Sequence, residues 1–168
     1  PPLSDYFSTI ARNWPSFPSA SNAELWCEPG RALVAEAESL LVRVDDRRDH
    51  CLYINDGGFG ALYDAVNIEW LFPAIRCRHA DRDLVPFKVY GPTCDDADCL
   101  QKPLELPSDT KPGDYIEIGT VGAYGRAMAT GFNGYGRYAH AELSDDPFPS
   151  LFAIGAAEDG PIIAEENC

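Results

Sequence analysis

Short apolar stretches separated by turn-forming residues constrain the fold of this chain more than any other feature of its sequence. The 168 residues include 14 glycines and 14 prolines, many of which stand between segments that suit a β-strand. The strand candidates are residues 51–55, 87–90, 115–118 and 138–143. The first of them ends in the turn signal N-D-G-G. Several short strands with few helices predict an antiparallel β-domain, either a barrel or a sandwich.

The beginning of the chain has a different pattern. Ser4 can cap a helix, whose apolar side would consist of Tyr6, Phe7, Ile10 and Trp14. Residues 15–22 are rich in proline and serine and are expected to form a loop, and residues 24–27 form a short apolar strand candidate. A helix, a loop and a buried strand in this order are typical of the last unit of an α/β barrel. Residues 32–44 fit both a helix and a strand, and periodicity does not decide between them.

The charge of the chain restricts its partners. Its 27 acidic and 13 basic residues give a formal net charge of −14. This charge repels nucleic acids and anionic membranes, whereas a cationic small substrate is compatible with it. No apolar run approaches the length of a membrane span, and the first residues lack the features of a signal peptide. We therefore expect a soluble, cytoplasmic protein.

The cysteines and histidines do not form a metal-binding pattern. None of the six cysteines belongs to a C-x-x-C motif, and the three histidines are scattered. We expect reduced thiols, most of them buried as small hydrophobic side chains, and no metal. The cysteines are Cys27, Cys51, Cys77, Cys94, Cys99 and Cys168.

Three motifs can carry chemistry. The first, E-P-G-R at residues 28–31, follows a predicted strand, and in an α/β barrel the active site lies at that end of the strands. A carboxylate at Glu28 and a guanidinium at Arg31 can contact different parts of one ligand, such as a ring nitrogen and a phosphate. The alternative is a turn held by a local ion pair between these two side chains.

The second motif, G-P-T-C-D-D-A-D at residues 91–98, is a rigid turn followed by a thiol among carboxylates. Neighbouring negative charge disfavours a thiolate, so we expect Cys94 to stay protonated and able to donate a proton. Asp95 can bind a cationic group. The alternative is a solvated acidic turn that contains a buried cysteine.

The third motif is G-A-Y-G at residues 122–125, followed by G-F-N-G-Y at residues 131–135. Small residues allow a close approach of the backbone, and the hydroxyl of Tyr124 can reach an anionic oxygen. The alternative is a tight glycine-rich hairpin with aromatic core residues.

Together, in this order and at these separations, the three motifs resemble those of the fold-type III decarboxylases that depend on pyridoxal phosphate (PLP). This family includes ornithine, lysine, arginine and diaminopimelate decarboxylases. The resemblance implies a mixed α/β fold, in which the last strand–helix unit of a PLP-binding α/β (TIM) barrel occupies residues 1–37. A C-terminal antiparallel β-domain would follow at residues 38–146, and residues 147–168 would be a tail. It also implies a short helix after Arg31 and then a long strand.

The resemblance assigns a role in binding PLP to four residues. Glu28 would pair with the protonated ring nitrogen, which keeps the ring cationic and able to accept electrons. Gly30, Arg31 and Tyr124 would bind the cofactor, with Arg31 and Tyr124 contacting its phosphate.

The resemblance also implies roles on the substrate side. Cys94 would be the catalytic proton donor and Asp95 would bind the distal ammonium of the substrate, both acting across the interface of a homodimer. Asp64 is the candidate for a second substrate-binding acid, Phe132 would line the substrate channel, and Asp98 would be an acid at the interface.

The motifs favour the ornithine type within the family. Diaminopimelate decarboxylases usually carry C-E-S and Y-N, where this chain has C-D at residues 94–95 and F-N at residues 132–133. The implied reaction is the conversion of L-ornithine to putrescine, in polyamine biosynthesis. Lysine or another diamino acid is the alternative substrate.

The lysine that would bind PLP covalently is not expected in this chain. The three lysines present, Lys88, Lys102 and Lys111, do not lie in a comparable context. The chain is then expected to be a fragment of a longer enzyme or to work with a barrel on another polypeptide. Two further alternatives are a non-catalytic homologue that acts as a regulatory binding protein, and a β-domain used only for assembly.

Overall fold

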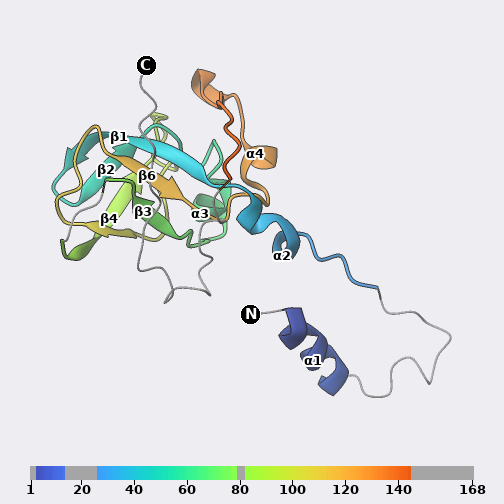
Figure 1. Cartoon of the computed structure of the whole chain (residues 1–168). Coiled ribbons are helices and arrows are strands. Elements are labelled where there is room, and N and C mark those ends of the chain that lie inside the picture. Colours follow the sequence, from blue (N-terminus) through green and yellow to red (C-terminus); the bar gives the residue numbers. More distant parts are fainter. Residues whose placement is uncertain (1–2, 14–25, 79–81, 145–168) are drawn as a thin grey trace.

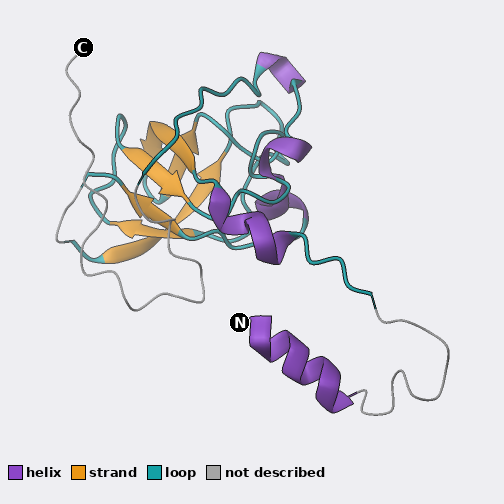
Figure 2. Ribbon diagram, turned by 45° about the vertical axis from the view of Figure 1, so that its right-hand side comes forward, coloured by secondary structure: helices purple, strands orange, loops and turns teal. Residues whose placement is uncertain are grey.

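A computed structural model describes residues 3–13, 26–78 and 82–144 of the chain (Figure 1). Helix α1 begins the described part, and five short helical segments follow it within the described residues. These are α1 (Leu3–Asn13), α2 (Arg31–Val34) with η1 (Ala35–Ala37), α3 (Tyr63–Asn67), α4 (Gly125–Met128) and η2 (Phe132–Gly134). Figure 2 shows α2, α3 and α4 gathered at one end of the sheet. Among the described residues, no helix has the length and apolar character that crossing a membrane would require.

Six strands form one sheet in the order β3-β6-β1-β2-β4-β5. Their bounds are β1 (Leu40–Arg48), β2 (Cys51–Ile54), β3 (Ala74–Arg76), β4 (Leu84–Tyr90), β5 (Leu104–Pro107) and β6 (Tyr115–Ile118). The two outer strands of this order, β3 and β5, contact each other. The sheet therefore curls until it is nearly closed, as a small barrel.

The long strand β1 makes this curvature possible. Its first half pairs with β6 and its second half with β2, and the register shifts between Val44 and Asp46. Such an irregularity bends a strand and increases its twist. Val42 and Val44 are fully buried, while the intervening Arg43 is exposed, as the alternation of side chains along a strand requires.

The core fills the inside of the curled sheet. Each large apolar side chain buried there stabilises the fold by about 1.5–3 kcal/mol. The core includes Val42, Val44, Leu52, Ile54, Leu62, Phe87, Val89, Leu104, Leu106, Ile116 and Ile118.

The predicted β-domain is confirmed, but the expectation of a purely antiparallel sheet is wrong at one pair. Strands β2 and β4 run parallel, with Leu52 opposite Val89. Parallel neighbours need a long crossover connection, and residues 55–83 supply one that contains α3 and β3. The strands expected at residues 51–55, 87–90 and 115–118 correspond to β2, β4 and β6.

The strand expected at residues 138–143 is not formed. The outer strands β3 and β5 face each other, so the curled sheet leaves little free edge with which that segment could pair. Instead, the Tyr138 hydroxyl hydrogen bonds to the carboxylate of Asp56 at 3.4 Å.

The N-terminal expectations are met in part. A helix is present, but it begins at Leu3, so Ser4 lies inside its first turn and does not precede it. The short helix after Arg31, followed by a long strand, is confirmed. No barrel unit is formed by the described residues, because Trp26 and Cys27 are not in a strand.

Several expectations fall on residues outside the described part of the chain. These are Trp14, the loop at residues 15–22, residues 24–25 and the tail at residues 147–168. The three domain boundaries stay predictions.

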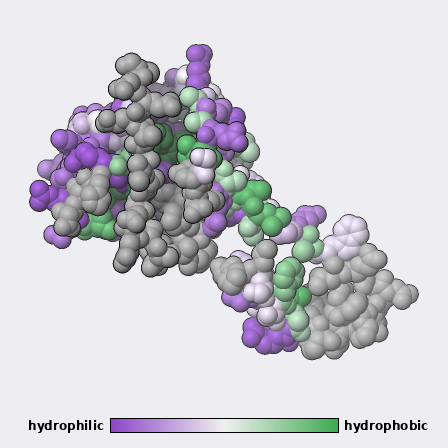
Figure 3. Space-filling model, viewed as in Figure 1, coloured by the Kyte–Doolittle hydropathy of each residue, from purple (hydrophilic) through white to green (hydrophobic). Residues whose placement is uncertain are grey.

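Hydrophobic side chains also lie on the surface around α2 (Figure 3). Leu33 is 62% exposed and Val34 is 44% exposed. The exposed side of α2 itself is thus apolar.

Candidate functional site

The parallel pairing of β2 and β4 determines where the chemistry-bearing loops lie. Because parallel strands end at the same edge of a sheet, the loop after β2 (residues 55–60) and the loop after β4 (residues 91–98) leave the sheet side by side. The two glycine-rich turns then touch. A Cβ atom on Gly57 would collide with the Cα atom of Gly91 and with the carboxylate of Asp98. Glycine at both positions permits this close approach.

Asp98 joins the two loops. One carboxylate oxygen accepts a hydrogen bond from the Gly58 amide at 2.7 Å. The other accepts hydrogen bonds from the Thr93 amide at 3.1 Å and the Thr93 hydroxyl at 2.7 Å. Asp98 is only 1% exposed, so its evident role within this chain is to hold the loops together. A contact of Asp98 with a partner subunit stays a prediction.

A third segment, residues 130–138, folds onto the first loop. The amide and hydroxyl of Thr130 both donate to the carbonyl of Phe59, at 2.8 and 2.9 Å. The rings of Phe59 and Phe132 pack with their centroids 4.7 Å apart. Phe132, which the sequence assigned to a substrate channel, thus lies against the loop that follows β2.

Cys94, in the loop after β4, contacts the third segment. Its thiol is exposed, and the side-chain amide of Asn133 donates to its sulfur at 3.8 Å. Asn133 has a φ of +52°, in the left-handed region where asparagine is among the more tolerant residues. Cys94 and Asp95 line a shallow pocket of about 290 Å³ together with Tyr53 and Tyr90. A thiol, a carboxylate and two phenol rings suit a small cationic ligand.

Arg31 is the centre of a second cluster, at the start of α2. Its guanidinium carbon lies 4.4 Å from the centroid of the Trp70 ring and 5.0 Å from that of Tyr124. Its Nη2 atom donates to Asp64, whose side chain is 9% exposed. Its Nη1 atom is buried and has no hydrogen-bond partner among the described residues. A buried cationic donor without a partner is costly, and such donors suit an anionic oxygen.

The backbone after β6 brings Tyr124 to Arg31. The Val121 and Gly122 amides donate to the carbonyls of Glu38 and Ala35 at 3.1 and 3.0 Å. A Cβ atom on Gly122 would collide with the carbonyl oxygen of Val34, so only glycine fits this contact. Tyr124 follows with a φ of +65°, a strained conformation for a bulky residue. Strain of this kind concentrates at functional sites.

A pocket of about 210 Å³ opens beside this cluster. Gly30, Arg31, Gly122 and Tyr124 are among the residues that line it. Three of the four residues that the resemblance assigns to the cofactor thus lie together. The fourth, Glu28, is exposed in the irregular segment that precedes α2.

Asp56 is a buried acid in the loop that follows β2, at 7% exposure. Burial raises the pKa of its carboxyl above the usual value, and hydrogen bonds from the Gly57 amide, the Ala61 amide and the Tyr138 hydroxyl oppose this. The same burial, together with the Asp56 charge, raises the pKa of Tyr138 above its ordinary range. Tyr138 therefore stays a hydroxyl donor at neutral pH and holds residues 130–138 against the first loop.

Comparison with known proteins assigns the fold. Residues 25–122 match the family described as pyridoxal-dependent decarboxylase, C-terminal sheet domain. The chain belongs to this family. Its cofactor is pyridoxal phosphate, and its known members include ornithine, diaminopimelate and arginine decarboxylases.

Individual relatives agree with the assignment. The chain is 30% identical to the decarboxylase flvG of Aspergillus flavus, over 78% of this chain and 35% of the relative. It is 31% identical to ornithine decarboxylase of Saccharomyces cerevisiae, over 71% of this chain and 31% of the relative. The chain thus spans about a third of the length of these curated relatives.

A solved structure shows the same fold. The lysine/ornithine decarboxylase of Vibrio vulnificus, in complex with cadaverine, superimposes with a TM-score of 0.68 at 26% identity. The match covers 86% of this chain and 40% of that protein.

The residues of the second cluster fit the anionic phosphate of the family's cofactor. Arg31 offers a buried donor without a partner, Tyr124 offers a hydroxyl, and Gly30 and Gly122 leave room for a close approach. The cluster carries one carboxylate, Asp64, which Arg31 already pairs.

The sequence motifs did not reveal every residue that shapes the site. Trp70 was missed because it belongs to none of the three motifs. The contact of Asn133 with Cys94 was missed because the third motif, which contains Asn133, gives no sign of a contact with the Cys94 loop. The expectation that most cysteines are buried is wrong for the described ones: Cys27 and Cys94 are exposed, and Cys51, Cys77 and Cys99 are half-buried. Cys168 lies outside the described residues.

Proposed function

We propose that this chain supplies the C-terminal part of the active site of a PLP-dependent decarboxylase that converts L-ornithine to putrescine. The protein would act in the cytoplasm as a homodimer that shares its active sites, with the covalent lysine on a barrel outside this chain. The observation that carries the proposal is the buried Arg31 donor beside Tyr124. Both side chains line one pocket in a domain that matches the sheet domain of the family.

The cofactor-side residues would hold and polarise the coenzyme. Pyridoxal phosphate, when bound, supplies a cationic ring that accepts the electron pair released as CO₂ departs. Arg31 would donate to the phosphate from Nη1, and Tyr124 and Gly30 would complete that binding surface. Glu28 keeps the ring nitrogen protonated, because a carboxylate beside it favours the cationic form.

The substrate-side residues would act on the amino acid. Cys94 would supply the proton that replaces CO₂ in the product, and Asp95 would bind the distal ammonium of the substrate. Asp64 is a second acid for that ammonium. Phe132, which packs on Phe59, forms an apolar wall of the channel.

L-Lysine is the second candidate substrate. The solved relative from Vibrio vulnificus is named as a lysine/ornithine decarboxylase and holds cadaverine. The two substrates differ by one methylene, which a binding pocket discriminates by only about 1–3 kcal/mol.

The test uses the complete protein that contains this chain. We expect release of CO₂ from carboxyl-labelled L-ornithine, faster than from L-lysine, L-arginine or meso-diaminopimelate. Faster release from one of the other amino acids would replace ornithine as the substrate. No release from any of them, by protein with bound PLP, would favour a non-catalytic homologue.

A cysteine pair tests the role of Cys94. In Cys94→Ala we expect slower decarboxylation and the diversion of some product to an aldehyde, because the proton is added at another atom than the carbon that has lost CO₂. The control is Cys99→Ala, which removes a half-buried thiol from the end of the same loop. Normal rate and product in Cys94→Ala would remove Cys94 from the site.

A further inference from the structure

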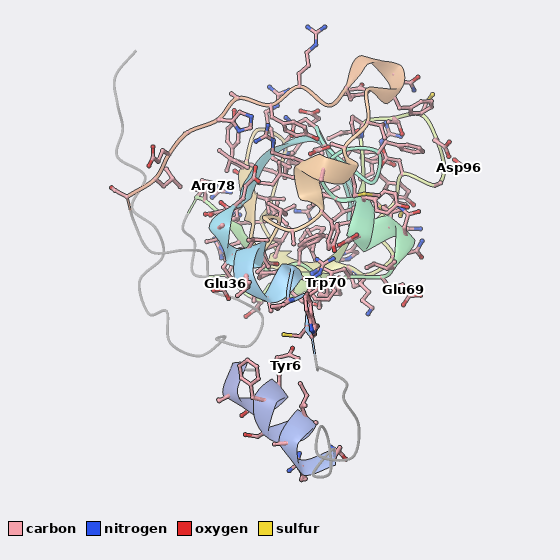
Figure 4. All side chains as sticks on the ribbon, turned by 90° about the vertical axis from the view of Figure 1, so that its right-hand side faces the viewer. Tyr6, Glu36, Glu69, Trp70, Arg78 and Asp96 are labelled. Carbon is pink, nitrogen blue, oxygen red and sulfur yellow. The ribbon has the colours of Figure 1, made fainter. Side chains whose placement is uncertain are left out.

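Trp70 contacts the phosphate-binding candidate Arg31 although it lies outside the three motifs of the sequence analysis. It lies in the irregular segment between α3 and β3, next to α2 (Figure 4). Its ring packs partly against the hydrophobic core, and its indole face lies 4.4 Å from the Arg31 guanidinium carbon. The same segment is tied to α3, since the Trp70 amide donates to the carbonyl of Asp64 at 3.0 Å.

The contacts around Arg31 restrict its guanidinium from several directions. The Trp70 and Tyr124 rings both lie within cation–π distance of it, and Asp64 holds the Nη2 atom. An arginine side chain otherwise loses rotamer entropy when it is fixed in place. The remaining terminal donor, Nη1, is buried and without a partner among the described residues.

Trp70 and Asp64 are linked by the chain as well as by Arg31. The carboxylate of Asp64 pairs the guanidinium, and its carbonyl accepts from the Trp70 amide. The Asp64 carboxylate and the Trp70 ring therefore hold Arg31 together, one from α3 and the other from the segment between α3 and β3. A shift of the Trp70 ring would change the direction in which Nη1 donates.

We propose that Trp70 is a positioning residue that holds the Arg31 guanidinium so that Nη1 donates to the phosphate of the cofactor. The proposal rests on the proposed function, because it assumes that Arg31 binds this phosphate. Trp70 acts through Arg31 and need not touch the cofactor. Its effect should thus be confined to ligands that carry the phosphate.

The experiment compares the binding of two probes, pyridoxal phosphate and pyridoxal, to the complete protein after removal of its cofactor. Both dissociation constants are measured by absorbance, without turnover. In Trp70→Leu, which replaces the aromatic face with an apolar side chain, we expect PLP to bind about 5–30-fold more weakly, the range that a partly desolvated cation–π contact supports. Pyridoxal should bind within about twofold of wild type, since the Arg31 contact does not involve its ring.

Two further variants separate the aromatic contact from packing. Trp70→Phe keeps an aromatic face and should retain most of the affinity for PLP. This variant keeps the test decisive even where Trp70→Leu unfolds more easily than wild type. Tyr115→Leu removes an aromatic ring from the exposed side of β6, beside Arg43, and should leave both constants unchanged. Equal losses of PLP and pyridoxal affinity in the Trp70 variants would overturn the proposal, since that pattern indicates a general loss of structure.

Arg31→Ala separates the failure of this proposal from the failure of the proposed function. It should abolish most of the preference for PLP over pyridoxal. If it leaves the preference intact, Arg31 does not bind the phosphate and the proposed function fails at that point. If Arg31→Ala removes the preference while Trp70→Leu keeps it in full, only the role of Trp70 is overturned.

Discussion

Tyr124 lies in a left-handed conformation at a φ of +65°, directly after the segment that Gly122 anchors on α2. The resemblance to the family predicted Tyr124 and Arg31 as phosphate-binding residues. In the structure the Arg31 guanidinium carbon lies 5.0 Å from the centroid of the Tyr124 ring. The sequence did not reveal why they meet. That depends on a contact between Gly122 and the Val34 carbonyl, which no pattern of residue types encodes. Trp70 was missed for a similar reason, because an aromatic residue near a core gives no sign of the cation beside it.

Gly122→Ala tests this anchoring contact. The added methyl group collides with the Val34 carbonyl oxygen, so the segment that carries Tyr124 must move away from Arg31. We expect a loss of about 1–3 kcal/mol in stability, as overpacking of a tight contact produces, and weaker binding of PLP. Gly131→Ala is the matched control, because nothing lies within 4 Å of a Cβ atom at Gly131 and its φ is −91°. Equal thermal midpoints for both variants would contradict the account.

The elements divide into those with a clear sequence signal and those without one. Residues 51–55, 87–90 and 115–118 alternate and end in turn residues, so β2, β4 and β6 were predicted close to their observed bounds. The strands β3 and β5 were not predicted: β3 has only three residues, and β5 (L-E-L-P) has no β-branched or aromatic residue and ends in proline. The parallel pairing of β2 and β4 is a tertiary property, and it alone brings the loop of Cys94 beside the loop of Phe59.

The contact between β3 and β5 is supported by ion pairs. Arg76 on β3 donates to Asp109, just after β5, at 2.6 Å, and lies 3.6 Å from Asp114 before β6. Arg78 pairs with Asp114 at 2.9 Å and lies 3.5 Å from Asp109. The Arg76 side chain is fully buried. These four side chains thus connect the two outer strands to β6.

This cluster predicts a loss of stability in acid. The hydrogen bond from Arg76 holds the pKa of Asp109 below its usual value of 3.8. A carboxylate whose pKa is lower in the folded state stabilises the fold above the unfolded pKa, and this contribution is lost as the pH falls through the folded value. The thermal midpoint should therefore fall as the pH drops below about 4.

Asp109→Asn should lower the midpoint at neutral pH and flatten its fall in acid. Asp96→Asn, at an exposed acid of the Cys94 loop, serves as the control and should keep the wild-type profile. The measurement is the thermal midpoint at a series of pH values between about 5 and 3. If the Asp109→Asn profile runs parallel to that of wild type, the acid sensitivity arises elsewhere.

At the scale of the whole molecule, the chain carries two groups of site residues with different expected destinations. The Arg31 cluster would bind the cofactor of its own subunit, whereas Cys94 and Asp95 would act on the substrate held by a partner subunit. The resemblance suggested this division, and the structure gathers each group into its own pocket. An assignment across subunits cannot be predicted from one sequence without a relative, because both groups lie on the same chain.

Mixing two inactive variants of the complete protein tests this shared site most directly. Arg31→Ala and Asp95→Ala are purified separately, each with little activity, and are then mixed so that their subunits exchange. A mixed dimer contains one site with wild-type Arg31 from one subunit and wild-type Asp95 from the other, so random exchange should restore about a quarter of the wild-type decarboxylation rate. If subunits exchange and activity does not recover, the two groups act within one subunit and the account of a shared active site is wrong.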